Sequence, residues 1–146
     1  AYAQQGESES VFLTFKRMKE AGVQPDAITY LHVLSACSHD GLVDKGRKYF
    51  DSMTREHGII PILEHYNCMV DLLGRAGQLE AISEMLNTMQ VEPDDVTWNT
   101  LLGACRRWGS IEIGRSAFDC LVKSDVKDAG TFVLMSNLLA NVQDIV

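Results

Sequence analysis

The sequence predicts an all-α solenoid of antiparallel helix pairs, because several residue types recur along the 146-residue chain in one register. The prolines lie 36 and 32 residues apart, the aromatic residues 36, 32 and 34, the glycines 35, 36 and 32, and the methionines 35 and 36. These residues are Pro25, Pro61 and Pro93; Tyr30, Tyr66, Trp98 and Phe132; Gly6, Gly41, Gly77 and Gly109; and Met18, Met53 and Met89. A fixed period of about 35 residues is typical of repeats that stack on their neighbours.

Each repeat is predicted to contain two amphipathic helices. From residue 27 to about 39 the apolar residues fall mostly every three or four positions, which is the spacing of one helix face. We expect Gly41 to end this helix, and the turn at residues 58–61 to end a second helix that starts near Val43. The two apolar faces are Ile28, Tyr30, Leu31, Leu34 and Cys37, then Val43, Gly46, Tyr49, Phe50 and Met53.

The following repeats keep this scheme. The first helices carry Tyr66, Met69, Val70 and Leu73, then Trp98, Leu101, Leu102 and Cys105. The second helices carry Leu79, Ile82, Leu86 and Met89, then Ile111, Gly114, Phe118 and Leu121. Residues 1–26 are expected to open on the tail of a first helix and continue as a second, and residues 129–146 to form a first helix with almost no second. Stacked pairs bury a continuous core that neither helix could form alone.

Composition excludes several classes of protein. No apolar run approaches the roughly 20 residues that span a bilayer, and the start lacks the pattern of a signal peptide, so we expect no membrane partner. The net charge of −7 argues against binding polyanions through bulk electrostatics, although a local basic stripe is compatible with it. Acidic residues are expected mainly on the second helices and the junctions.

No catalytic or metal-binding motif is present. The four cysteines, Cys37, Cys68, Cys105 and Cys120, contain no Cys-x-x-Cys pair and have no neighbouring histidine pair, so we expect reduced, buried thiols. The chain also lacks the His-x-Glu signature of zinc deaminases, a Ser-His-Asp arrangement and a phosphate-binding glycine loop. We therefore expect a protein that is not an enzyme and holds no cofactor.

A period near 35 with an aromatic residue, Gly, Met and Gly-x-x-Pro-Asp resembles the pentatricopeptide repeat, a plant organelle RNA-binding family. The segments "LSACSHDGLVDKGRKYFDSM", "LEHYNCMVDLLGRAGQLEA", "LLGACRRWGSIEIG" and "AGTFVLMSNL" resemble the C-terminal part of its PLS subclass. The resemblance implies a right-handed superhelical solenoid, and a location in the mitochondrion or chloroplast. It divides the chain into the end of a standard-length motif (1–26), a long motif (27–62), a short motif (63–94), a first E motif (95–128) and a truncated second E motif (129–146).

The resemblance also implies how RNA is recognised. Members bind single-stranded RNA along the groove lined by the first helices, one base per repeat, chosen mainly by the fifth and last residues of each motif. In the long motif those positions hold Leu31 and Ile62, which cannot hydrogen-bond a base, so this repeat is implied to be a spacer. The implied base-recognition residues are Asn67 with Asp94, Asn99 with Asp128, and Asp26. The pair Asn67 and Asp94 implies uridine over cytidine.

The second position of each motif is implied to wedge between neighbouring bases. Ile28 and Val96 suit that role, whereas Glu64 would place a negative charge against the RNA. Basic residues recur near the ends of the first helices, where they can meet phosphates or simply be solvated side chains favoured by the helix dipole. These residues are His39, Arg75, Arg106 and Arg107. Taken singly, Asp26 and Asp94 are more typical of helix capping, whereas their register within the repeats favours base recognition.

The function that this resemblance implies is sequence-specific binding of an organellar transcript, for C-to-U editing by a deaminase supplied downstream in cis or in trans. The alternative is a protein-interaction solenoid that recruits editing cofactors or other RNA-processing partners. A role in splicing or assembly is a third possibility.

Overall fold

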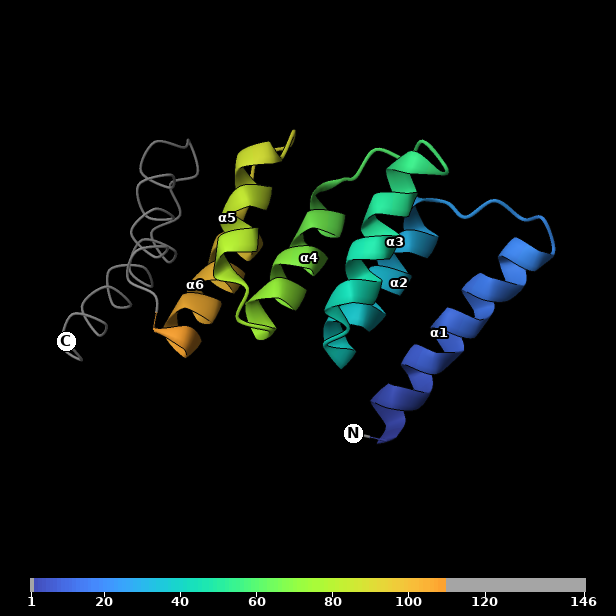
Figure 1. Cartoon of the computed structure of the whole chain (residues 1–146), viewed down its shortest axis with the longest axis horizontal. Coiled ribbons are helices and arrows are strands. Elements are labelled where there is room, and N and C mark those ends of the chain that lie inside the picture. Colours follow the sequence, from blue (N-terminus) through green and yellow to red (C-terminus); the bar gives the residue numbers. More distant parts are fainter. Residues whose placement is uncertain (1, 110–146) are drawn as a thin grey trace. The chain divides into compact units, whose positions relative to one another are not determined.

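The computed structural model describes residues 2–109, and within that range it contains six α-helices and no strand (Figure 1). The helices are α1 (Tyr2–Glu20), α2 (Ala27–Asp40), α3 (Val43–Arg55), α4 (Leu63–Arg75), α5 (Leu79–Thr88) and α6 (Asp95–Trp108). The prediction of an all-α chain of helix pairs is confirmed. The chain divides into two compact units, Ala1–Leu72 and Leu73–Val146, and the boundary falls inside α4.

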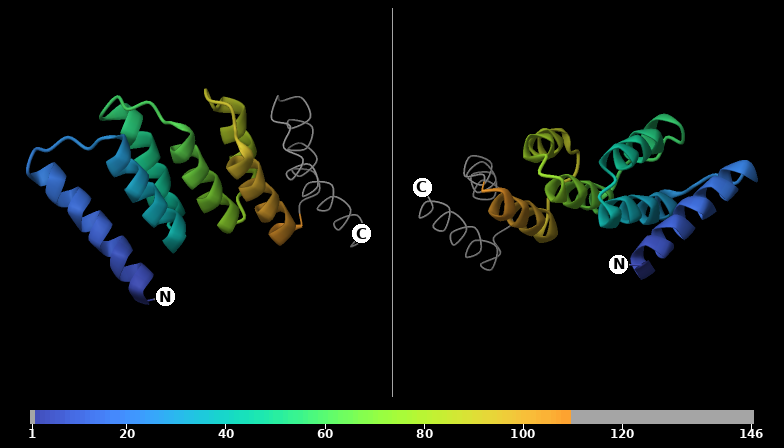
Figure 2. Two further views of the ribbon diagram at one scale, coloured as in Figure 1. Left: turned by 180° about the vertical axis from the view of Figure 1, so that it is seen from behind. Right: turned by 60° about the horizontal axis from the view of Figure 1, so that its bottom comes forward.

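In the first unit, α2 packs against both α1 and α3 (Figures 1 and 2). The core of this unit centres on Phe15, Tyr30, Val33 and Met53, which are all buried. The Phe15 ring meets the Tyr30 ring edge-on at 5.3 Å between centroids, and the Tyr30 hydroxyl lies 3.1 Å from Ser52 Oγ. The recurrent residues Tyr30 and Met53 are therefore core residues of this unit, whereas Met18 is only partly buried.

Close packing of neighbouring helices requires a glycine at position 46, in the middle of α3. A Cβ atom placed on this residue would lie 2.4 Å from Leu72 Cδ2 of α4 and 3.4 Å from Cys37 Cβ of α2. The side chain of Leu72 is fully buried. Glycine is therefore the residue that lets α3 approach both first helices of this unit.

In the second unit, α5 packs against α6. Gly74 brings the end of α4 close to α6, since a Cβ atom there would lie 2.9 Å from Ala104 Cβ. The Trp108 indole lies against Gly77, and its Nε1 atom donates to the Gly74 carbonyl at 2.8 Å. Trp108 therefore joins the end of α6 to the turn between α4 and α5.

The recurrent glycines end the first helices, as predicted. Gly41 after α2 and Gly109 after α6 both have φ of 68°, and Gly77 between α4 and α5 has φ of 75°, which is the left-handed conformation of a helix C-cap. The expected division of residues 1–26 into the tail of a first helix and a second helix is wrong, because α1 runs through Gly6 as one helix of 19 residues. An interior glycine costs a helix about 1 kcal/mol, which a helix of this length tolerates. The helices and cores predicted from residues 110–146 lie outside the described residues.

Candidate nucleic-acid interface

The first helices α2 and α6 begin on the aspartates that the resemblance placed in base recognition. Asp26 is the N-cap of α2, and its exposed carboxylate accepts from Thr29 N at 2.8 Å and from Thr29 Oγ1 at 2.8 Å. The backbone hydrogen bond from Thr29 lowers the pKa of Asp26 below its usual value. Capping is therefore a real role of this side chain, as the alternative interpretation of the sequence held.

Asp94 caps α6 in the same way and completes a capping box. Its carboxylate accepts from Thr97 N at 3.0 Å, while Thr97 Oγ1 accepts from the Asp94 N–H at 3.2 Å. The backbone dihedrals of the two caps agree within a few degrees: φ −109° and ψ −177° at Asp26, φ −107° and ψ −173° at Asp94. The repeats therefore reproduce one local geometry at the start of these two helices.

Helix α4 has no capping side chain at the equivalent position, because Ile62 occupies it. His65 makes the hydrogen bond that Thr97 makes in the capping box of α6: its Nδ1 atom accepts from the Ile62 N–H at 3.0 Å. Since Nδ1 is an acceptor, the ring proton of the neutral imidazole is on Nε2, which donates to the Ala27 carbonyl at 2.8 Å. His65 is fully buried and so ties the start of α4 to the start of α2.

Sequence reasoning missed the position that His65 shares with Thr29 and Thr97. Each of these residues lies three positions after the residue that precedes its helix, and each makes a hydrogen bond there. The signal was available, because a polar residue three positions after Asp, Ser or Thr is the spacing of a capping box. His65 would still have been hard to assign, since its bond to Ala27 spans 38 residues.

The residues predicted to wedge between bases lie on the first turns of these helices and are open to solvent. Ile28 on α2 is 64% exposed and Val96 on α6 is 55% exposed. Glu64 occupies the same position on α4 and is also exposed. These exposures leave the side chains accessible to a ligand, and their role as wedges stays a prediction.

The predicted base-recognition positions come one turn later. Leu31 on α2 and Asn67 on α4 are partly buried, and Asn99 on α6 is exposed. Asp26 and Ile28 share the start of α2, as Asp94 and Val96 share the start of α6. Asn67 belongs to the first compact unit and Asp94 to the second. The remaining partner, Asp128, lies outside the described residues.

The four predicted phosphate-facing residues are all exposed and lie in the last turns of the first helices. His39 lies in the last turn of α2, Arg75 is the last residue of α4, and Arg106 and Arg107 lie in the last turn of α6. Positive charge at a helix C-terminus interacts favourably with the helix dipole. The placement of these residues therefore agrees with the interpretation that they are solvated side chains favoured by the dipole. Contact with phosphate stays a prediction.

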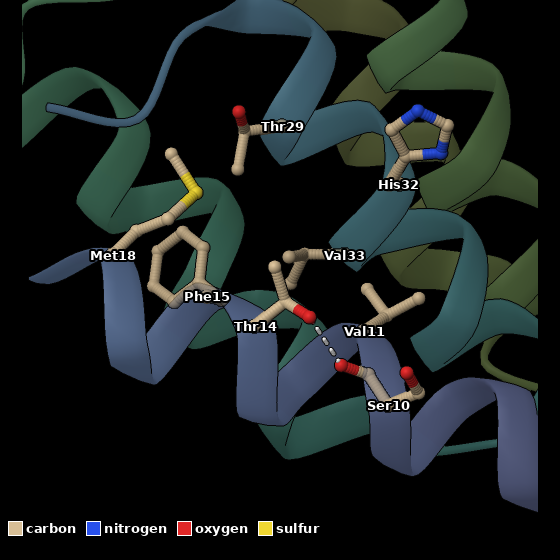
Figure 3. A pocket seen from close by; sticks show the side chains of 8 residues that line it. All are labelled: Ser10, Val11, Thr14, Phe15, Met18, Thr29, His32 and Val33. Atoms are coloured by element: carbon tan, nitrogen blue, oxygen red, sulfur yellow. Dashed lines mark hydrogen bonds between the residues drawn. The ribbon is translucent and has the colours of Figure 1, made fainter. Parts of the chain in front are cut away.

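A pocket of about 270 Å³ lies between α1 and α2 (Figure 3). The side chains of Val11, Phe15, Met18 and Val33 line it together with His32. Thr14 donates to the Ser10 carbonyl at 2.8 Å along its edge (Figure 3). Because its lining is largely apolar and holds no lysine or arginine, this pocket does not suit a phosphate backbone.

The described cysteines are free thiols. Cys37 and Cys105 are buried and Cys68 is partly buried. Burial raises the pKa of each of the three thiols to about 11, so they are protonated at neutral pH. Cys120 lies outside the described residues.

The part of the chain that the structure describes, residues 2–109, contains no group of three or more histidine, cysteine or acidic side chains that could hold a metal ion. None of its helices is both long enough and apolar enough to cross a membrane.

The repeats of this chain match the sequence models of a known family. The family model described as "Pentatricopeptide repeat domain" matches residues 1–40 and 15–76, and the model described as "PPR repeat" matches residues 64–92 and 96–126. The chain belongs to the pentatricopeptide repeat family. The predicted family is thereby confirmed, while the PLS subclass and the E motifs stay predictions.

Relatives in the pentatricopeptide repeat family include two proteins of Arabidopsis thaliana. One, named as chloroplastic, is 44% identical over 140 residues, covering 96% of this chain and 19% of the relative. The other, named as mitochondrial, is 48% identical over 141 residues, covering 97% of this chain and 22% of the relative. The chain thus spans about a fifth of the length of these relatives.

Solved pentatricopeptide repeat structures share the fold. The maize protein PPR10 matches with a TM-score of 0.67 and 32% identity, over 88% of this chain and 19% of that one. PPR10 in complex with an 18-nucleotide psaJ RNA element matches with a TM-score of 0.75 and 27% identity, over 96% of this chain and 21% of that one. The repeat domain of Arabidopsis protein-only RNase P 1, solved with tRNA, is 16% identical with a TM-score of 0.79 over 96% of this chain and 76% of that one, and supports the fold alone.

Proposed function

We propose that this chain is part of a protein that binds single-stranded RNA in a plant organelle, and that it acts by recognition and not by catalysis. Support comes from PPR10, a relative by fold and sequence that was crystallised with an 18-nucleotide RNA element. The names of two Arabidopsis relatives, one chloroplastic and one mitochondrial, support an organellar location.

The observation that carries this proposal is the shared geometry at the starts of α2 and α6. A capping aspartate is followed two residues later by an exposed aliphatic side chain, Ile28 or Val96. Apolar groups held on a rigid first turn can pack against the face of a base without selecting among bases, because every base has a π-face. Asn99 lies three residues after Val96, and Asn67 lies at the same position of α4. Both side chains are amides, which can donate to and accept from a base edge.

The finer proposal is that the protein is a specificity factor for C-to-U editing of the PLS subclass. The short motif would prefer uridine to cytidine through Asn67 and Asp94, and the chain would hold the transcript for a deaminase supplied in cis downstream or in trans. The partners would then be RNA, editing cofactors and the deaminase. The sequence segments that resemble the PLS subclass and its E motifs support this finer assignment.

Binding of short single-stranded RNAs to the 146-residue chain tests the proposal. Uridine-rich and adenine-rich RNAs would be compared at low and moderate salt, with Asn67→Ala as the test variant. Asn87→Ala, an exposed asparagine on α5, is the matched control because it makes the same substitution on a second helix. We expect a uridine preference that Asn67→Ala removes and Asn87→Ala keeps. An affinity for RNA that is the same in all three proteins would count against base reading.

A second candidate function is protein binding, and exposed apolar residues before α4 favour it. Ile60 is 73% exposed and Ile62 is 45% exposed, and Glu64, two residues after Ile62, is also exposed. Such a surface suits a protein partner better than RNA. If the chain binds no RNA at low salt but binds a purified editing cofactor, and Ile60→Ser weakens that complex, the protein-binding function is the correct one.

A further inference from the structure

A groove of about 550 Å³ carries a concentration of positive charge on the second helices of the first unit, where acidic residues were expected. Its cations are Lys19 of α1 and Lys45, Lys48 and Arg55 of α3. Asp51 and Glu56 are its acidic residues, and Tyr49 and Ser52 contribute hydroxyl groups. All of these residues lie within the unit Ala1–Leu72.

The acidic residues of the groove already have partners. Glu56 Oε2 pairs with Lys19 Nζ at 3.2 Å, and Asp51 pairs with Arg55 one turn away on α3. Among the residues that the structure describes, neither Lys45 nor Lys48 forms an ion pair. The groove therefore presents two ammonium groups that form no ion pair with a carboxylate of the described residues.

Contacts between α1 and α3 hold the groove in place. Lys45 Nζ lies 3.6 Å from the centroid of the Phe12 ring, which is a cation–π contact from α3 to α1. The Phe12 and Tyr49 rings are stacked with centroids 6.0 Å apart. The ammonium group of Lys45 is thus held by the Phe12 ring, and its N–H groups that point away from the ring can donate to an anion.

The three cations of α3 form a line. Lys45, Lys48 and Arg55 occupy positions i, i+3 and i+10 of one helix, and Ser52 lies at i+7, so all four share one face. Ten residues of α-helix are about 15 Å long. The arrangement suits a chain of regularly spaced anions better than a single ion.

We propose that this groove, made by Lys19, Lys45, Lys48 and Arg55 on the second helices, binds the phosphate backbone of RNA outside the first-helix surface. The inference rests on the proposed RNA-binding function and adds a second site to it. Three of the four cations are lysines, a residue that is depleted in protein–protein interfaces and common in phosphate contacts. The groove therefore favours RNA over an acidic protein segment, and it contributes affinity without base selection.

The test measures RNA affinity against salt concentration for RNAs of 6 and 18 nucleotides. The variant is Lys45→Gln with Lys48→Gln, and the matched control is Lys16→Gln with Arg17→Gln, which removes two exposed charges of α1 that do not line the groove. For single-stranded RNA each phosphate contact contributes about 0.7 to the slope of log K against log salt. We expect the groove variant to lower that slope by about 1.4 on the longer RNA, with no change in base preference, and the control to leave the slope unchanged. Circular dichroism verifies that each variant folds.

Several outcomes overturn the inference. If Asn67→Ala weakens binding but the groove variant and the control give the same slope as the unaltered chain, the groove is not a phosphate site although the proposed function holds. If the unaltered chain binds neither RNA at low salt, both proposals fail together. If the Lys45→Gln, Lys48→Gln variant weakens binding of polyglutamate but not of RNA, the groove binds an acidic protein partner.

Discussion

His65 and Ala27 are joined by a hydrogen bond of 2.8 Å from the imidazole Nε2 atom to the backbone carbonyl. The bond links the first turns of α2 and α4, which are the turns that carry Ile28 and Glu64. Because the same ring also accepts from the Ile62 N–H, one buried side chain both starts α4 and positions it against the preceding first helix.

Replacing His65 with alanine is expected to lower the free energy of unfolding by about 1–3 kcal/mol, because a buried N–H and a carbonyl lose their partner. Urea unfolding followed by circular dichroism measures this change. His65→Asn serves as the comparison, since it can still accept locally from Ile62 but is too short to reach Ala27. Equal stability of the alanine variant and the unaltered chain would show that the two bonds are not needed.

Loss of the Asp94 cap is expected to destabilise the second unit. Asp94→Ala removes the acceptor for Thr97 N, and loss of an N-cap costs about 1 kcal/mol. Asp94→Asn should retain most of the stability, because asparagine is an equally good cap. Thermal unfolding of the two variants would separate loss of the cap from loss of the charge. An equal loss of stability in both variants would mean that the charge of Asp94, and not its capping hydrogen bond, stabilises the unit.

Acid should weaken the cap of α2. The pKa of Asp26 is lower in the folded chain than its usual value of 3.8, so the folded state favours the charged carboxylate. This contribution to stability is present above the unfolded pKa and disappears as the pH falls through the folded pKa. We expect Asp26→Asn to reduce the loss of stability below pH 4, measured by urea unfolding across that range. An identical pH profile in the variant would exclude Asp26 as a contributor.

Gly46→Ala is expected to be destabilising, because the new Cβ atom would lie 2.4 Å from Leu72 Cδ2. Overpacking of a buried contact costs about 1–3 kcal/mol. The matched control is Gly103→Ala in the middle of α6, where an added Cβ atom meets nothing within 4 Å and the helix should gain about 0.5–1 kcal/mol. Opposite signs in the two variants, measured by chemical unfolding, would confirm the close approach, and a gain at both positions would contradict it.

The buried thiols are expected to react slowly. With a pKa of about 11, about one thousandth of each thiol is ionised at pH 8, and only the thiolate is nucleophilic. In a Cys120→Ser background, labelling of Cys37, Cys68 and Cys105 by a thiol reagent should be slow when folded and rapid in denaturant. Fast labelling of any of the three in the folded chain would show that its environment is more open than the structure indicates.

The sequence predicted the helix pairs well because their determinants are local or periodic. The apolar stripe around Tyr30 and the left-handed conformation of Gly41 both follow from residues within a few positions. The expected division of residues 1–26 into two helices was wrong because Gly6, in the register of the other glycines, lies inside α1, and the register alone does not distinguish an interior glycine from one that ends a helix.

The site was predicted only in part, because its geometry depends on contacts between distant residues. The capping role of Asp26 and Asp94 was visible as an alternative, since the capped residue is three positions away. The role of His65 and the groove at Lys45 were not visible, because they arise when segments that are 38 and 33 residues apart in the sequence meet. Whether Asn67 reads a base stays a prediction.

Trp108, which contacts Gly74 and Gly77, belongs with Trp98 to the second unit and makes that unit optically distinct from the first. Both tryptophans of the chain lie in Leu73–Val146: Trp98 is 3% exposed and Trp108 is 52% exposed. Intrinsic tryptophan emission therefore reports on this unit alone, whereas circular dichroism reports on all the helices. If the two signals change together during unfolding, the repeats unfold cooperatively. If they change at different denaturant concentrations, the second unit unfolds separately from the rest, and no attached label is needed to detect this.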